Sequence, residues 1–311
     1  MQAHKLGVIG LGKIAQDQHL PVIKENPAFE LLAVASQRGV PVEGVPHAFK
    51  DWREMLRLPD LDAVAICTPP QPRHAIARAA LEAGTHVLLE KPPTASLSEL
   101  VDLKRLAASA GRTLFTTWHS QYNRAVAEAR QALAGRSIKS LLVTWKEDVR
   151  QWHPGQDWIW QAGGFGVFDP GINALSIVTR IMPAPVFIRR ADLEFPSNKD
   201  APIAATLEFG SGQPDEDLRA VFDWRQTGEQ TWDIAVETSD GMSLKLMKGG
   251  SRLEIDGRLV VEEPPAEYEG IYRRFNELLA NKRSEVDTDP FRLVADAFMI
   301  GRHIAAEPFS E

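Results

Sequence analysis

The chain has 311 residues, of which 44% are hydrophobic and 25% charged, proportions that are ordinary for a globular protein of about two domains. The net charge of −7 argues against a nucleic-acid-binding protein, and no apolar run reaches the roughly 18 residues of a membrane span. The single cysteine, Cys67, excludes an internal disulfide. The first expected strand begins by Leu6, which leaves no room for a signal peptide, so we expect a cytoplasmic protein.

The first 120 residues alternate between short apolar runs and helical segments. The expected strands are 5–10, 31–36, 62–67, 86–89 and 114–117, and the expected helices are a segment ending near 24, 51–57, 74–83 and 96–110. Because the apolar runs are continuous, they predict a parallel sheet with helices on both faces. We therefore expect an α/β, doubly wound Rossmann domain over residues 1–120.

The pattern changes near residue 120, where strand-like segments begin to follow one another. The expected strands are 140–149, 186–194, 203–208, 219–224, 231–238 and 242–246, with helices at 123–134, 172–181, 269–279 and 292–303. Runs of strands of this kind predict a separate α+β domain with a mostly antiparallel open sheet. We assign residues 121–311 to it as the substrate-binding and dimerisation domain.

A dinucleotide fingerprint follows the first expected strand. Gly10 permits a tight turn, Gly12 lets the backbone approach a pyrophosphate, and the small Ala15 lets the following helix pack closely on the strand. The N-terminus of that helix attracts the phosphates. The turn, including Lys13 and Ile14, is therefore expected to bind a dinucleotide.

The second expected strand ends in Ser36, Gln37 and Arg38. An NAD-specific site usually places an acidic residue here to hold the ribose hydroxyls, and none is present. Ser36 could donate to a 2′-phosphate, while Arg38 could pair with that phosphate or stack on adenine. These residues predict a preference for NADP, with NAD still possible; the alternative is an exposed arginine at a strand end.

The segment Glu90-Lys91-Pro92-Pro93 follows the fourth expected strand. Ligands of open parallel sheets bind at the carboxyl ends of the strands, so Lys91 is a candidate catalytic group near the cofactor. Thr68, Pro69 and Pro70 end the preceding strand, and we expect them near the nicotinamide. The alternative for Lys91 is a solvated lysine in a proline-rich turn.

Four motifs in this region resemble the Gfo/Idh/MocA oxidoreductases. They are Gly10-Leu-Gly-Lys-Ile-Ala15, Asp62-Ala-Val-Ala-Ile-Cys-Thr-Pro-Pro70, His74 and Gly84-Thr-His-Val-Leu-Leu-Glu-Lys-Pro-Pro93. The resemblance implies an NAD(P)-dependent oxidoreductase in which Lys91, Glu90 and His74 belong to the cofactor site. It also implies a homodimer formed through the open sheet of the second domain.

The second half carries a narrower signature, made of Trp145-Lys-Glu-Asp148, Trp152-His-Pro-Gly155, Trp158-Ile-Trp160 and Gly166-Val-Phe-Asp-Pro-Gly-Ile-Asn173. It is similar to the bacterial aldose 1-dehydrogenases that act on L-arabinose or D-galactose. The resemblance implies oxidation of a cyclic aldose at C1 to a lactone, with hydride transfer to NADP. The alternatives are another sugar or inositol oxidoreductase of the same family, or a sugar and nucleotide sensor without turnover.

Asp169 and Asn173 lie four residues apart and would share one face of a helix. Asp-Pro-Gly is also a good helix start, so Asp169 is expected to be an N-cap. The family pattern places a histidine where this chain has Asn173, which cannot exchange a proton near neutral pH. We therefore expect Asp169 to accept the proton, with Lys91 as its partner, while Asn173 binds a sugar hydroxyl.

Four further residues are candidates for substrate binding. Glu147 lies on a strand, with a solvated charge cluster as its alternative, and His153 is expected in a loop. His119 follows the fifth expected strand and could be structural. Four of the eight tryptophans fall between 145 and 160, and indole faces can cover the C–H face of a sugar, so we expect Trp152 near the substrate. No set of Cys and His residues has zinc spacing, so no metal is expected.

Overall fold

The structure, a computed structural model, describes residues 3–310, so the outermost residues of the two expected domains lie outside it. The chain divides into two compact units. The first runs up to His119 and includes Tyr268–Asp287, and the second comprises Ser120–Glu267 and the segment from Thr288 onward. Tyr268–Asp287, which the sequence assigned to the second domain, therefore pack with the first.

The first unit contains a six-stranded sheet in the order β3-β2-β1-β4-β5-β6. Its strands are β1 (His4–Ile9), β2 (Phe29–Ala35), β3 (His47–Phe49), β4 (Ala63–Ile66), β5 (His86–Leu89) and β6 (Leu114–Thr116). All neighbouring strands are parallel, which confirms the predicted Rossmann-type sheet. β3, with three residues, was too short to be predicted. The strand order reverses between β1 and β4, where ligands of such sheets bind.

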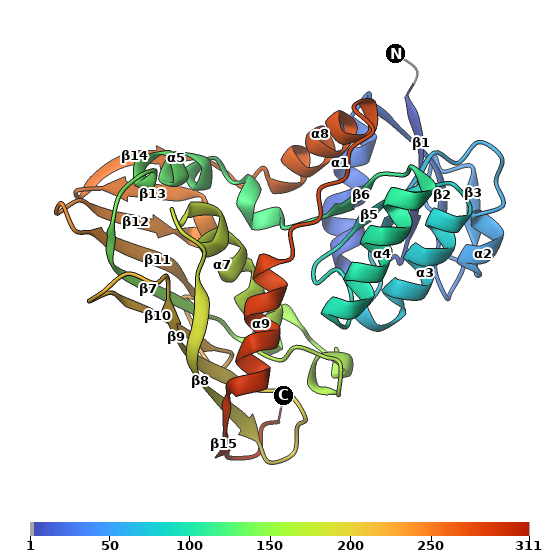
Figure 1. The fold of residues 1–311 in the computed structure, drawn as a ribbon. Helices are drawn as coiled ribbons and strands as arrows, with labels where there is room; N and C mark the ends of the chain where they lie inside the picture. The colour runs from blue at the N-terminus through green and yellow to red at the C-terminus, as the bar shows by residue number, and fades with distance from the viewer. Residues whose placement is uncertain (1–2, 311) are drawn as a thin grey trace. The chain divides into compact units, whose positions relative to one another are not determined.

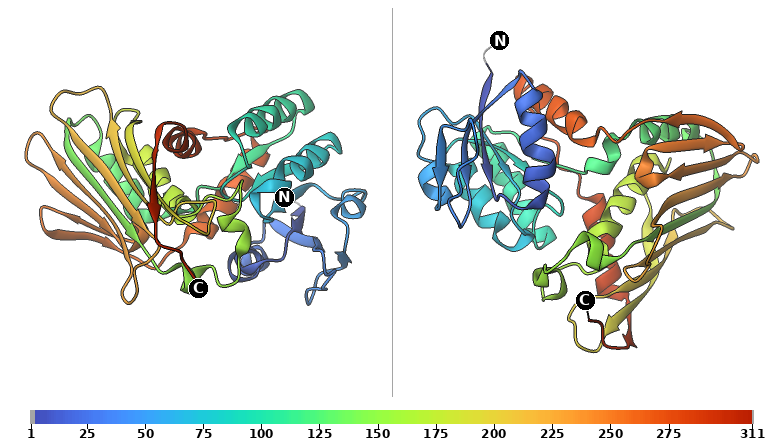
Figure 2. Two further views of the ribbon diagram at one scale, coloured as in Figure 1. Left: turned by 90° about the horizontal axis from the view of Figure 1, so that it is seen from below. Right: turned by 180° about the vertical axis from the view of Figure 1, so that it is seen from behind.

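Helices cover both faces of this sheet. They are the π-helical turn η1 (Ala15–His19), α1 (Leu20–Glu25), α2 (Trp52–Met55), α3 (Pro70–Glu82), α4 (Leu97–Ala110) and α8 (Glu267–Ala280). The 3₁₀ turn η2 (His119–Tyr122) begins where the first unit ends. α1 and α8 lie on one face, and α3 and α4 on the other (Figures 1 and 2). The ring of Phe275 on α8 stacks with Phe29 of β2 and Phe115 of β6, so α8 spans the sheet and completes its core.

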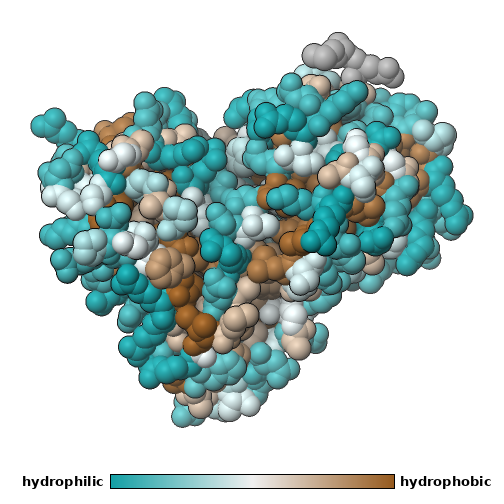
Figure 3. Space-filling model, in the orientation of Figure 1, coloured by the Kyte–Doolittle hydropathy of each residue, from teal (hydrophilic) through white to brown (hydrophobic). Residues whose placement is uncertain are grey.

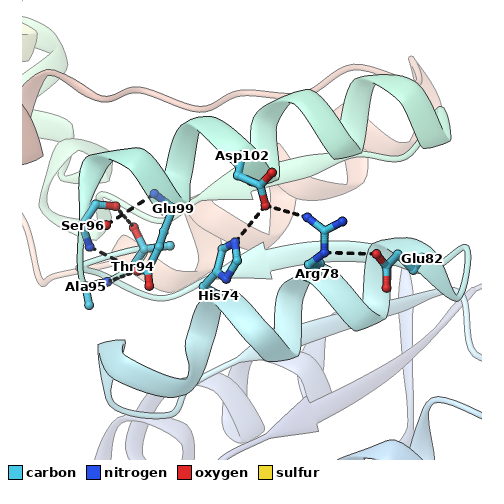
Figure 4. Close-up of polar contacts among 8 residues, drawn as sticks. All are labelled: His74, Arg78, Glu82, Thr94, Ala95, Ser96, Glu99 and Asp102. Atoms are coloured by element: carbon cyan, nitrogen blue, oxygen red, sulfur yellow. Dashed lines mark hydrogen bonds and ion pairs between the residues drawn. The ribbon is translucent and has the colours of Figure 1, made fainter.

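Local sequence explains where α4 begins and ends. Ser96 accepts a hydrogen bond from the Glu99 backbone N–H, and the Glu99 carboxylate accepts one from the Ser96 N–H, forming a capping box (Figure 4). Gly111 follows the helix at φ +62°, the left-handed conformation that glycine adopts without strain. These two signals fix the predicted helix at both ends.

The second unit contains a nine-stranded sheet in the order β14-β13-β12-β11-β7-β10-β9-β8-β15. Its strands are β7 (Ile138–Lys146), β8 (Phe187–Pro196), β9 (Ala204–Gly210), β10 (Asp217–Asp223), β11 (Thr231–Thr238), β12 (Ser243–Met247), β13 (Arg252–Ile255), β14 (Arg258–Glu262) and β15 (Arg302–Ala306). β7 pairs with β10 and β8 with β15 in parallel, and the other neighbours are antiparallel. The predicted mostly antiparallel sheet is thus confirmed.

The helices of the second unit lie on one face of its sheet (Figures 1 and 2). They are α5 (Arg124–Leu133), α6 (Val149–Trp152), η3 (Asp157–Trp160), α7 (Phe168–Ile181), η4 (Lys248–Gly250) and α9 (Asp289–Ile300). Leu141 and Val143 of β7 are buried on the covered face, whereas Leu142 between them is 47% exposed. Hydrophilic side chains predominate on the molecular face drawn in Figure 3. No helix of residues 3–310 is long and apolar enough to cross a membrane.

Two predictions about helix ends were wrong. The last helix stops at Ile300 and the chain enters β15, because a Cβ at Gly301 would lie 2.4 Å from the Ala297 carbonyl oxygen and the glycine permits this close turn. α7 begins at Phe168, one residue before the predicted cap, so Asp169 lies in the first turn and is not the N-cap. The Asp169 side chain is therefore available for contacts other than capping.

Candidate functional site

A cavity of about 1150 Å³ lies in the first unit at the carboxyl ends of β1, β2 and β4. It exceeds the roughly 300–1,000 Å³ of most small-ligand pockets, which suits an extended ligand such as a dinucleotide. Seven residues that the sequence assigned to the cofactor line it: Gly10, Gly12, Ser36, Gln37, Arg38, Thr68 and Pro69.

The two glycines of the fingerprint differ in what surrounds them. Gly10 has φ +94°, and a Cβ there would lie 2.8 Å from the Thr68 backbone nitrogen and 2.9 Å from the Cys67 carbonyl carbon. A Cβ at Gly12 would meet no heavy atom of the described chain within 4 Å. Gly10 is thus required by the protein itself, whereas Gly12 leaves open space at the start of a helix, where a pyrophosphate could approach.

Unsatisfied hydroxyl groups also mark the cavity wall. The Oγ of Ser36 and the Oγ1 of Thr68 are buried and have no hydrogen-bond partner among residues 3–310. Buried polar atoms in native proteins are nearly always paired, so these hydroxyls fit a bound group that supplies the missing partners. The residues present therefore fit a dinucleotide cofactor.

The segment from Lys50 to Arg53 also lines the cavity, which the sequence did not indicate. The Arg53 guanidinium lies 4.1 Å from the centroid of the Trp52 ring, and Asp51 accepts a hydrogen bond from it. Lys50 and Arg53 join Arg38 as cationic groups of the wall. The signal that could have shown this is the short β3, which brings the segment beside the end of β2.

The remaining residues assigned to the cofactor lie outside this cavity wall. Lys13 pairs with Asp17 on the surface, Ile14 precedes η1, and Pro70 is the first residue of α3. His74 on α3 lies 2.9 Å from the Asp102 carboxylate on α4, which also binds Arg78 (Figure 4). In the structure His74 therefore joins two helices.

Lys91 follows β5, and its backbone N–H donates to Glu90 Oε2 over 2.7 Å. The Glu90 carboxylate is buried in the interior of the first unit and does not line the cavity. The His119 ring stacks on Tyr268, whose hydroxyl donates to Glu90 Oε1. Lys91, Glu90 and His119 thus gather at the adjacent carboxyl ends of β5 and β6.

In the second unit, Asp169 and His153 lie together. The His153 Nε2 is 3.4 Å from the Asp169 Oδ2, and both side chains are largely buried. The His153 ring also lies 5.3 Å from the ring of Trp224, which directly follows β10. His153 caps the short helix α6, so it is held by its own turn as well as by these contacts.

Glu147, just after β7, is a second buried carboxylate in this unit. The Trp224 Nε1–H donates to Glu147 Oε1 over 3.3 Å, and the Trp232 Nε1–H donates to Oε2 over 2.9 Å. Burial excludes the alternative that Glu147 belongs to a solvated charge cluster. Trp152, 37% exposed, lies edge-on against Trp232 with ring centroids 5.5 Å apart.

The structure therefore gathers Glu147, His153, Asp169 and Trp152 around two tryptophans that the sequence did not single out. Asn173 lies one turn beyond Asp169 on α7 and is partly exposed. Trp232 reaches the site because it is the register partner of Trp145 across β11 and β7. No local motif reveals this register, so the sequence could not place Trp224 or Trp232.

This arrangement offers acid–base chemistry and recognition of hydroxyl groups. Buried carboxylates accept strong hydrogen bonds, and a carboxylate beside an imidazole can take up a proton. Among residues 3–310, no group of three or more His, Cys, Asp and Glu side chains could hold a metal ion.

Known proteins resemble the chain at three levels. Residues 4–118 match the Gfo/Idh/MocA model, described as an oxidoreductase family with an NAD-binding Rossmann fold. The chain is 48% identical to the galactose 1-dehydrogenase of Pseudomonas fluorescens over 313 aligned residues, covering 99% of each chain. It is 54% identical to the solved D-galactose-1-dehydrogenase of Rhizobium etli, with a TM-score of 0.94 over 100% of this chain and 99% of that one.

A more distant structure shares the fold. A 3-ketoreductase from Actinomadura kijaniata, solved with TDP-benzene and NADP, is 19% identical with a TM-score of 0.83, covering 98% of this chain and 99% of that one. Full-length identity near one half, together with the family model over the first unit, supports the resemblance expected from the motifs. The chain belongs to the Gfo/Idh/MocA family of oxidoreductases.

Proposed function

We propose that this protein is an NADP-preferring aldose 1-dehydrogenase that oxidises D-galactose at C1 to the lactone, with L-arabinose as a second substrate. The observation that carries the proposal is the 48% identity to a galactose 1-dehydrogenase over 99% of both chains. As pyranoses the two sugars match around most of the ring, and galactose adds a hydroxymethyl group at C5. NADP, when bound, takes up the hydride that leaves C1.

Asp169 accepts the proton of the C1 hydroxyl in this proposal. Its carboxylate is buried beside His153, and a group that takes a proton must be held in place before the reaction. Lys91 donates a hydrogen bond to the reacting sugar. Loss of hydride from C1 and of a proton from the hydroxyl together convert the hemiacetal carbon to the lactone carbonyl.

The other predicted residues bind the sugar. Glu147, held by two indole N–H groups, accepts hydrogen bonds from sugar hydroxyls, and Asn173 can both donate and accept. The exposed face of Trp152 covers the C–H face of the ring. At the cofactor, Arg38 and Ser36 contact the 2′-phosphate.

Absorbance at 340 nm tests the proposal directly. Purified protein is incubated with D-galactose, L-arabinose, D-glucose or myo-inositol, each with NADP⁺ and with NAD⁺. We expect kcat/KM to be highest for D-galactose with NADP⁺ and about tenfold or more lower for glucose, whose C4 hydroxyl is inverted. No rate with any aldose would contradict the dehydrogenase assignment, and a faster reaction with inositol would contradict the substrate.

We also propose that two copies associate through the open face of the nine-stranded sheet. This face carries the exposed Leu142 among charged side chains, including the Lys245–Asp233 pair. Light scattering after size-exclusion chromatography should give twice the mass of one chain. A monomer at micromolar concentration would contradict the proposal.

A further inference from the structure

We propose that a buried network of Glu90, His19 and Tyr268, together with Arg73, positions the backbone of Lys91 for hydride transfer. The inference rests on the proposed function, in which Lys91 contacts the sugar. Glu90 acts here as a positioning residue and not as a cofactor contact.

Glu90 is 1% exposed, and both of its carboxylate oxygens are hydrogen-bonded inside the first unit. Oε1 accepts from the Tyr268 hydroxyl over 2.6 Å and lies 3.1 Å from His19 Nε2, while Oε2 accepts from the Lys91 N–H over 2.7 Å. Rotation of this carboxylate would break all three contacts together. The carboxylate therefore fixes the peptide that carries Lys91.

His19 supplies the charge that the buried carboxylate needs. Its Nδ1 lies 2.7 Å from the Tyr272 hydroxyl, so both ring nitrogens have partners. Burial lowers the pKa of His19, but Cys67, Tyr272 and Glu90 together raise it well above its usual value. Burial likewise raises the pKa of Glu90, but His19, His119 and Tyr268 outweigh it and lower that pKa, so the shifts of both groups favour their charged forms.

Arg73 holds the same segment from the other side. It is 4% exposed, its Nε donates to the Thr68 carbonyl over 2.7 Å, and its Nη1 donates to the carbonyls of Glu90 and Pro92. The carbonyls of the two residues that flank Lys91 are thus tied through Arg73 to Thr68, just beyond β4. Side-chain bonds on both flanks leave the Lys91 backbone little freedom.

The origin of these residues indicates what the network is for. His19 ends the π-helical turn η1, a helix type that is rare and often occurs at functional sites. Tyr268 and Tyr272 lie on α8, about 180 residues after Glu90 in sequence. Two distant segments, η1 and α8, therefore converge on the carboxylate that precedes Lys91, which is more than one short turn needs for its own stability.

The test compares Tyr268→Phe and Glu90→Gln with Leu103→Ala, a control that removes buried side chain from α4 on the other face of the sheet. The readouts are kcat, the KM for NADP⁺, the isotope effect with D-galactose deuterated at C1, the thermal midpoint, and hydrogen exchange in residues 88–94. Since a misplacement of 1 Å can cost about 100-fold in rate, we expect kcat to fall about tenfold in Tyr268→Phe and about 100-fold in Glu90→Gln. The isotope effect should rise, the KM for NADP⁺ should stay within about threefold, and exchange should accelerate at 88–94.

The control should lower the thermal midpoint without changing kcat or exchange at 88–94. Unchanged kcat and exchange in Tyr268→Phe, or the same loss of kcat in Leu103→Ala, would overturn the proposal. If Glu90→Gln does not fold, Tyr268→Phe still tests the proposal, because this substitution removes only the hydroxyl that donates to Glu90. Wild-type protein without aldose oxidation would refute the proposed function, whereas exchange at 88–94 would still decide whether Glu90 and Tyr268 hold the Lys91 backbone.

Discussion

Substitution of Gly10 and Gly12 by alanine separates the structural and the binding roles of the fingerprint. Alanine at Gly10 must adopt φ +94°, which costs about 1–3 kcal/mol for a residue with a side chain. Its Cβ would also lie 2.8–2.9 Å from backbone atoms of Cys67 and Thr68, and forcing atoms into a packed site typically costs a further 1–3 kcal/mol. We expect Gly10→Ala to lower the free energy of unfolding by about 2–6 kcal/mol.

Gly12→Ala should behave in the opposite way. A Cβ there meets no described atom within 4 Å and Gly12 has no positive φ, so alanine should leave stability unchanged or raise it by about 0.4–1 kcal/mol. The same methyl group would occupy the space in which the pyrophosphate approaches the backbone. We expect the Kd for NADP to rise about tenfold or more.

Gly111→Ala is the matched control for conformation. Gly111 has φ +62°, and its Cβ would likewise meet no described atom within 4 Å, so alanine there incurs the conformational cost without the clash. Urea unfolding gives the stabilities, and fluorescence titration with NADP gives Kd. If Gly10→Ala is no less stable than Gly111→Ala, the argument from the clash is wrong. If Gly12→Ala binds NADP as tightly as wild type, the pyrophosphate does not lie at Gly12.

Three further substitutions test the charges and hydrogen bonds of the two units. Burial and the nearby Arg112 lower the pKa of His86 to about 4, and the His86 Nδ1 accepts a hydrogen bond from the Thr113 N–H. Between pH 6.5 and 4 the unfolded chain therefore binds more protons than the folded one. The free energy of unfolding falls as the pH falls through that window. His86→Gln should flatten this part of the urea-midpoint profile, and an unchanged slope would refute the argument. Arg38→Ala should lower the NADP/NAD ratio of kcat/KM about tenfold if the guanidinium binds the 2′-phosphate; an unchanged ratio would remove that assignment. Trp232→Phe removes the indole N–H that donates to Glu147 over 2.9 Å. Because a hydrogen bond to a charged group contributes about 1.5–3 kcal/mol, the KM for the sugar should rise about tenfold or more. The Kd for NADP should not change. A sugar KM at the wild-type value would argue against contact between Glu147 and substrate.

The sequence predicted the first unit well because its signals are local. Gly10 follows a buried strand, and Ser96 with Glu99 forms a capping box, so nearby residues mark where these elements begin or end. The right-handed crossovers that parallel strands require then restrict how these elements can be arranged. The segment Tyr268–Asp287 was misassigned because helical periodicity reports which face is apolar but not which core covers it.

The site of the second unit was predicted only in part for a similar reason. Glu147, His153 and Asp169 were found by motif, but the groups that orient Glu147 come from cross-strand register and from a turn after β10. A residue's partner across a sheet can be tens of positions away, and a shift of one residue would turn its side chain to the other face. The contacts of Trp224 and Trp232 with Glu147 could therefore be recognised only once the pairing of the strands was known.

The asparagine at 173 gains meaning from this placement. A histidine at that position would approach Asp169 from one turn along the same helix, and this chain lacks it. His153 instead brings an imidazole to 3.4 Å from the Asp169 carboxylate from the end of α6, a different element. Because the imidazole lies beside the carboxylate, the absence of a histidine at 173 does not remove an acid–base partner from Asp169. Position 173 is then left to an amide, which can bind a hydroxyl but does not compete for the proton.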